Sequence, residues 1–91
     1  MGSRSGARTL KAKVYVTLKP SLLDAQGKTL MHALRSLGFA VVTDVRVGKY
    51  LELMLASRSR RAAQQEVERM CQKLLANPVI ETYRFEFNSS R

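Results

Sequence analysis

The stretch DVRVGKYLEL (Asp44–Leu53) decides how the middle of the chain folds. Apolar residues alternate with polar ones up to Val47, and then Gly48 and Lys49 interrupt the pattern before it resumes. Strict alternation over several residues is typical of a strand with one buried face. The interruption therefore predicts a turn between two strands.

The parity of the alternation selects the length of this turn. A two-residue loop would place Glu52 opposite Val45, among the core valines. A three-residue loop, Gly48–Tyr50, pairs Val47 with Leu51 and keeps the aliphatic side chains on one face, with Gly48 supplying a positive φ. A single bent strand with a bulge preserves the same parity, so both readings stay open.

The flanking segments supply two more strands and two helices. KVYVTLKP (Lys13–Pro20) and VIETYRFEF (Val79–Phe87) both alternate and predict strands. Apolar residues at helical spacing predict a first helix over about Gly27–Leu37, with Asp24 as a candidate cap and Gly38 after its end.

The second helix is predicted within SRSRRAAQQEVERMCQKLLANP, which begins at Ser57. Ser59 is its candidate N-cap, and Asn77-Pro78 ends it. The predicted apolar stripe consists of Ala63, Val67, Met70, Cys71 and Leu74.

The predicted element order is βαββαβ, which is that of a ferredoxin-like fold. We therefore expect an α+β domain with a four-stranded antiparallel sheet and two helices on one face. The other face would carry Tyr15, Thr17, Tyr50 and Met54, which are too apolar for a fully hydrated surface. This face is predicted to mediate self-association or partner binding, with Tyr15, Thr17 and Met54 at an oligomer interface.

Composition suggests one small domain. The chain has 91 residues, a formal net charge of +9 and a single cysteine, Cys71. We expect a flexible Gly/Ser/Arg-rich leader over residues 1–10, a single domain over 11–88 and a short tail over 89–91. No apolar run approaches a membrane span, no secretory signal pattern is visible, and one cysteine cannot form an internal disulfide, so a cytoplasmic location is expected.

The sequence offers no catalytic constellation. His32 is the only histidine, and no second ligand stands at metal-binding spacing. Cys71 lies on an apolar stripe, where a structural thiol is expected. The high positive charge keeps an RNA-binding domain as an alternative, although Tyr50 is the only aromatic residue in the strand where that class needs several. An amino-acid-binding ACT-like regulatory module is a second alternative.

Three motifs in order resemble one family: KVYVTLKPSLLDAQG, DVRVGKYLEL and CQKLLANPVIETYRFE. They are similar to the PurS subunit of bacterial phosphoribosylformylglycinamidine (FGAM) synthase, and the likeness spans about Lys11 to Phe87. The resemblance implies an accessory subunit of an ATP-dependent carbon–nitrogen ligase that takes its amide nitrogen from glutamine. Such a subunit bridges the glutaminase PurQ and the synthetase PurL, and it forms a dimer or tetramer. It assists ammonia transfer in the conversion of formylglycinamide ribonucleotide (FGAR) to FGAM.

The resemblance also implies where chemistry takes place. We expect no catalytic residue, metal or cofactor on this subunit, with ATP and Mg²⁺ on the synthetase partner. The expected partner contacts lie in the middle motif, at Asp44, Arg46, Gly48, Lys49 and Tyr50.

Overall fold

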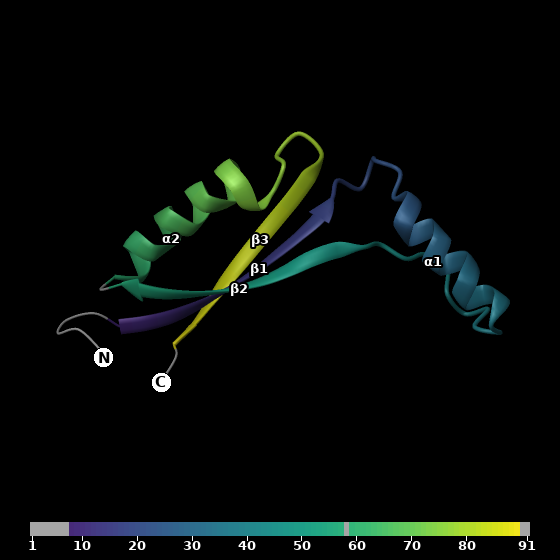
Figure 1. Ribbon diagram of the computed structural model, residues 1–91, viewed down its shortest axis with the longest axis horizontal. Coiled ribbons are helices and arrows are strands. Elements are labelled where there is room, and N and C mark those ends of the chain that lie inside the picture. The colour runs from purple at the N-terminus through teal and green to yellow at the C-terminus, as the bar shows by residue number, and fades with distance from the viewer. Residues whose placement is uncertain (1–7, 58, 90–91) are drawn as a thin grey trace.

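The computed structural model describes residues 8–57 and 59–89, and Figure 1 shows their arrangement. In chain order the elements are β1 (Arg8–Leu18), α1 (Ala25–Ser36), β2 (Gly48–Ser57), α2 (Arg60–Met70), the π-helical turn η1 (Cys71–Leu75) and β3 (Glu81–Ser89). β1 begins within the range assigned to a leader, of which residues 1–7 lie outside the described part, and the domain boundaries stay a prediction.

The sheet has three antiparallel strands in the order β2-β1-β3. Val14 of the central strand lies opposite Leu51 on one side and Phe85 on the other. The four-stranded βαββαβ prediction is therefore wrong, because residues 38–47 form no strand. The Val47 amide, which was expected to join a ladder, donates instead to a carboxylate oxygen of Asp24.

The core lies between the sheet and α2. Ala12, Val14 and Val16 are buried under Val67 and Cys71. The partly buried side chains packed around them are Leu51, Leu53, Leu55, Leu75, Tyr83, Phe85 and Phe87. The alternation of β3, which alone did not fix its orientation, thus places its aromatic rings on the helix side.

The end of the second helix departs from its predicted stripe. Ser59 caps α2 as predicted, and Ala63, Val67 and Cys71 are buried. Leu74, the last predicted stripe residue, is 81% exposed. The cause is η1, in which the Ala76 amide donates to the Cys71 carbonyl oxygen, five residues back, so that the wider turn brings Leu75 to the core in place of Leu74.

α1 does not lie on the sheet, so the prediction of two helices on one face is also wrong. Figure 1 shows it beyond the end of the strands, and the molecule measures 56 × 28 × 17 Å. Asp24 caps the helix, and Gly38 follows it with a φ of 103°, both as predicted. Gly27 is the only buried residue of α1.

Gly48 has a different purpose from the one predicted. It starts β2 opposite Thr17 and is not part of a hairpin loop; among the described residues, Gly38 alone has a positive φ. A Cβ atom at position 48 would overlap the carbonyl oxygen of Val16. The two strands approach so closely that no side chain fits at position 48, so a glycine is required there.

Within the described ranges, no helix is both long enough and apolar enough to cross a membrane.

Candidate functional site

The sheet face opposite α2 carries a cluster of aromatic and polar side chains, which we call the open face. The rings of Tyr15 and Tyr50 lie side by side on β1 and β2, with centroids 5.1 Å apart. The guanidinium carbon of Arg84 on β3 lies 4.0 Å from the centre of the Tyr15 ring, which is a cation–π distance. Tyr50 and Met54 are 50% and 57% exposed. All four residues predicted for this face, including Thr17, lie on it.

Carboxylates hold the two tyrosine hydroxyls in place. Tyr15 donates to Glu86 Oε2 over 2.9 Å, and Tyr50 donates to Glu52 Oε2 over 2.8 Å. The hydrogen bond to Glu52 raises the pKa of Tyr50 to about 12, and that to Glu86 raises the pKa of Tyr15. The hydrogen bond from Tyr50, followed by the charge of Lys11 3.5 Å away, lowers the pKa of Glu52. These pairs fix an exposed apolar surface in one geometry.

A shallow hollow continues the open face toward the end of β1. It is lined by Thr17, Leu18, Pro20, Asp44, Arg46 and Thr82. Two of the predicted partner contacts, Asp44 and Arg46, therefore lie beside the predicted interface residue Thr17. The Thr17 and Thr82 hydroxyls are 3.4 Å apart across β1 and β3.

The Arg46 side chain forms hydrogen bonds within the chain itself. Its guanidinium donates to the carbonyl oxygens of Lys19 and Leu18 over 2.9 and 3.3 Å, and to that of Leu22 over 3.4 Å. These bonds tie the segment before β2 to the turn that follows β1. Arg46, which was predicted to contact a partner, therefore also stabilises this turn.

Lys49 is separated from the other predicted contacts. It lies opposite Val16 in the ladder, on the α2 side of the sheet, and its Nζ donates to the Leu75 carbonyl oxygen over 2.9 Å. Tyr50, the next residue, faces the other way. The predicted contact residues therefore lie on both faces of the sheet and at the base of α1, and they do not form a single site.

Sequence reasoning missed the second role of Asp24. One carboxylate oxygen caps α1 through the Gly27 amide, and the other accepts from the Val47 amide. These two bonds, the Val47 bond first, lower the pKa of Asp24. The cap was visible in the sequence, but no local signal indicates a partner 23 residues away.

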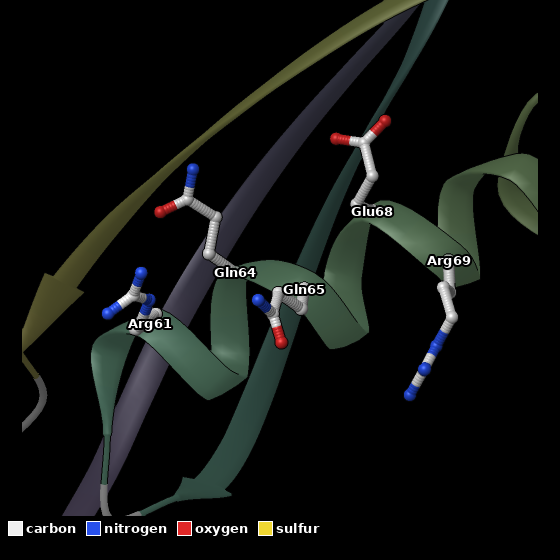
Figure 2. A pocket seen from close by; sticks show the side chains of 5 residues that line it. All are labelled: Arg61, Gln64, Gln65, Glu68 and Arg69. Carbon is white, nitrogen blue, oxygen red and sulfur yellow. The ribbon is translucent and has the colours of Figure 1, made fainter.

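The outer side of α2 forms a polar hollow, shown in Figure 2, that no motif singled out. It is lined by Arg61, Gln64, Gln65, Glu68 and Arg69. Glu68 accepts hydrogen bonds from the Tyr83 hydroxyl and from Gln72 Nε2, so its carboxylate serves to join α2 to β3. The other four lining residues are exposed, and Arg69 pairs with Glu66 on the same helix.

Reactive groups are dispersed over the part of the chain that the structure describes. No three His, Cys, Asp or Glu residues gather there as a metal site. His32 is exposed on α1. Cys71 is buried, as predicted, and burial followed by the charge of Glu68 raises the pKa of its thiol, which disfavours the nucleophilic thiolate.

Comparisons with known proteins agree on one family. The family model described as PurS, phosphoribosylformylglycinamidine (FGAM) synthase, matches residues 11–89. The PurS subunit of Bacillus subtilis is 54% identical over 76 residues, covering 84% of this chain and 89% of its own length. The PurS subunit of Synechocystis is 42% identical over 85 residues, covering 93% and 85%.

Solved structures show the same likeness. The B. subtilis PurS structure superposes with a TM-score of 0.80 at 51% identity, covering 88% of this chain and 99% of that one. A chain in the structure of PurLQS from Thermotoga maritima superposes with a TM-score of 0.82 at 28% identity, covering 88% and 98%. The resemblance drawn from the three sequence motifs is confirmed, and the chain belongs to the PurS family of FGAM synthase subunits.

Proposed function

We propose that the chain is the small subunit of FGAM synthase in purine biosynthesis, where it joins the glutaminase and synthetase subunits. The observation that carries this proposal is the family match over residues 11–89. It is supported by the T. maritima PurLQS structure, whose name combines PurL, PurQ and PurS and which contains a chain with this fold.

The exposed apolar surface suits a contact subunit. Three apolar residues at the far end of α1, Leu37, Phe39 and Val41, are 73%, 54% and 87% exposed. Exposed apolar residues gathered in one place are typical of protein contact surfaces.

The division of labour follows from the chemistry. Ammonia released from glutamine loses its nucleophilic lone pair when water protonates it, so a shielded path between subunits protects the reaction. This chain supplies contact surface for that path, while ATP, Mg²⁺ and the catalytic groups belong to the synthetase and glutaminase. Its own contribution is therefore to coupling and not to bond-making.

Two surfaces are proposed for contact. The open face, with Tyr15, Thr17, Tyr50 and Met54, is assigned to self-association, because its rings are held rigid and half exposed. Asp44 and Arg46, near the base of α1, Gly48, at the start of β2, and Lys49, whose side chain reaches the end of η1, are assigned to the other subunits.

Reconstitution tests the function. The chain is mixed with the glutaminase and synthetase of the same cell, and FGAM formation is measured with glutamine and, in parallel, with ammonium chloride. We expect the chain to be required with glutamine and dispensable at high ammonia concentration. If omitting it changes neither rate, the proposal is wrong.

A further inference from the structure

The segment that leads from η1 to β3 exposes three large apolar side chains, and we call it the apolar connection (residues 74–80). Leu74 is 81% exposed, Val79 75% and Ile80 40%, although connections between elements usually carry polar residues. Figure 1 shows the segment at the end of the sheet where β1 ends and β3 begins. There the Ile80 carbonyl oxygen accepts from the Lys19 amide over 2.9 Å. The apolar connection is therefore attached to the sheet while its side chains remain outside the core.

The exposure of Leu74 results from the π-helical turn η1. In a regular α-helix, Leu74 would share one apolar stripe with Val67 and Cys71, which are both buried. In η1 it is Leu75 that packs against the core, and Leu74 is left outside. π-helical turns are rare and frequently lie at functional sites. The chain thus adopts an uncommon helical turn whose effect is to present a leucine at the surface.

Asn77 holds the backbone of the apolar connection in one conformation. Its amide donates to Glu81 Oε1 over 2.6 Å, and its side-chain Oδ1 accepts from the Val79 amide over 3.1 Å. Its carbonyl oxygen accepts from the Ile80 and Glu81 amides over 3.1 and 2.7 Å. Because these amides are already engaged, the segment offers a partner mainly its apolar side chains. A segment held in one conformation also loses less conformational entropy when it binds.

Lysines flank the apolar connection. Lys49 reaches it from β2, where its Nζ donates to the Leu75 carbonyl oxygen over 2.9 Å. Lys73, beside Leu74, is exposed. The carboxylate of Glu81, which follows the segment, accepts from an amide of the segment itself. Together with the net charge of +9 on the whole chain, the two lysines favour a partner surface that carries carboxylates.

We propose that the apolar connection, with Lys49 and Lys73 beside it, is the docking surface for an acidic segment of a partner subunit. The three exposed apolar side chains contact apolar side chains of that segment, and the two lysines pair with carboxylates around them. An apolar centre with a polar rim is the usual anatomy of a protein interface. The inference rests on the proposed function, which supplies the glutaminase and the synthetase as partners. It is separate from self-association, which is assigned to the open face.

The test measures binding of the full chain to the purified synthetase and, separately, to the purified glutaminase of the same cell. The double variant Leu74→Ala/Val79→Ala removes two exposed side chains that do not support the core. We expect its affinity for one of these subunits to fall at least about tenfold, while its midpoint of urea unfolding is unchanged. Leu30→Ala, which shortens an exposed leucine on α1, is the matched control and should bind as the wild type does.

A second variant tests the charges without altering the apolar side chains. Lys73→Glu is expected to slow association with the same subunit at low salt, and the difference from the wild type should shrink as salt is added. If the double variant loses stability, Lys73→Glu decides alone, and an association rate equal to that of the wild type at low salt would overturn the inference.

The outcomes separate this inference from the proposed function. If the wild type binds and the double variant binds both subunits equally well, or no worse than Leu30→Ala does, the inference is wrong. Weakened self-association with unchanged binding to both subunits would assign the apolar connection to contact between copies, and would also overturn the inference. A wild-type chain that binds neither subunit would overturn the proposed function, and the inference with it.

Discussion

The carbonyl oxygen of Val16 occupies the space that a side chain at Gly48 would need. Gly48 lies opposite Thr17 at the start of β2, so the two strands meet there through backbone alone. This contact marks the point at which the segment that returns from α1 ends and β2 begins.

Gly48→Ala is expected to lower the free energy of unfolding by about 1–3 kcal/mol, because the added methyl group forces β1 and β2 apart. Urea denaturation followed by circular dichroism measures the change. Gln65→Ala, at an exposed position of α2, is the control. A loss no larger at Gly48 than at Gln65 would contradict the close-contact explanation.

The π-helical turn predicts different effects of alanine substitution on stability at Val67 and at Leu74. These two residues would lie on the same face of a regular α-helix. Val67→Ala removes fully buried methyl groups and is expected to cost roughly 1–3 kcal/mol. Leu74→Ala, at an exposed site, is expected to change stability by less than about 0.5 kcal/mol. Denaturation at low protein concentration checks both values. A large loss at Leu74 would mean that the helix continues without the wider turn.

Lys49 offers a matched pair of substitutions. Lys49→Met and Lys49→Glu both remove the hydrogen bond to the Leu75 carbonyl oxygen, at an expected cost of about 0.5–1.5 kcal/mol. Lys49→Met removes the positive charge and Lys49→Glu reverses it, so both should weaken binding to the partner subunits, and Lys49→Glu should do so more strongly. Size-exclusion chromatography of the mixed subunits measures this binding. Equal binding by the two variants would exclude a contact role for the charge.

The tyrosines predict a distinctive behaviour at alkaline pH. Hydrogen bonds to Glu52, Glu86 and Glu68 raise the pKa values of Tyr50, Tyr15 and Tyr83, in the case of Tyr50 to about 12. A raised folded-state pKa means that each bond stabilises the fold below pH 10 and that this stability is lost as the pH rises through the folded-state value. Ultraviolet titration should therefore show tyrosinate forming later in the folded chain than in urea. Coincident titration curves would contradict the hydrogen bonds.

Features that depend on neighbouring residues were predictable from sequence. The caps at Asp24 and Ser59, the glycine after α1 and the shared face of Tyr15 and Tyr50 are all found where expected. Each follows from a spacing of a few residues or from strand parity.

Features that depend on distant partners were not predictable. The expected strand before Gly48 fails because Asp24 takes the Val47 amide out of any ladder. The expected packing of α1 on the sheet fails because Asp24 holds the start of α1 against the Val47 amide, beyond the end of the strands. At the candidate site, the sequence placed Lys49 in a loop, and only the structure shows that it lies in β2 and donates to the Leu75 carbonyl oxygen of η1.

The central position of β1 has a consequence for synthesis on the ribosome. Of the three strands, β1 is made first and β3 last, yet Val14 needs both Leu51 and Phe85 as neighbours. At about 5–20 residues per second, the intervening chain takes several seconds to emerge. During that interval one edge of β1 is unpaired, and the nascent chain is exposed to chaperones and to premature pairing with other chains.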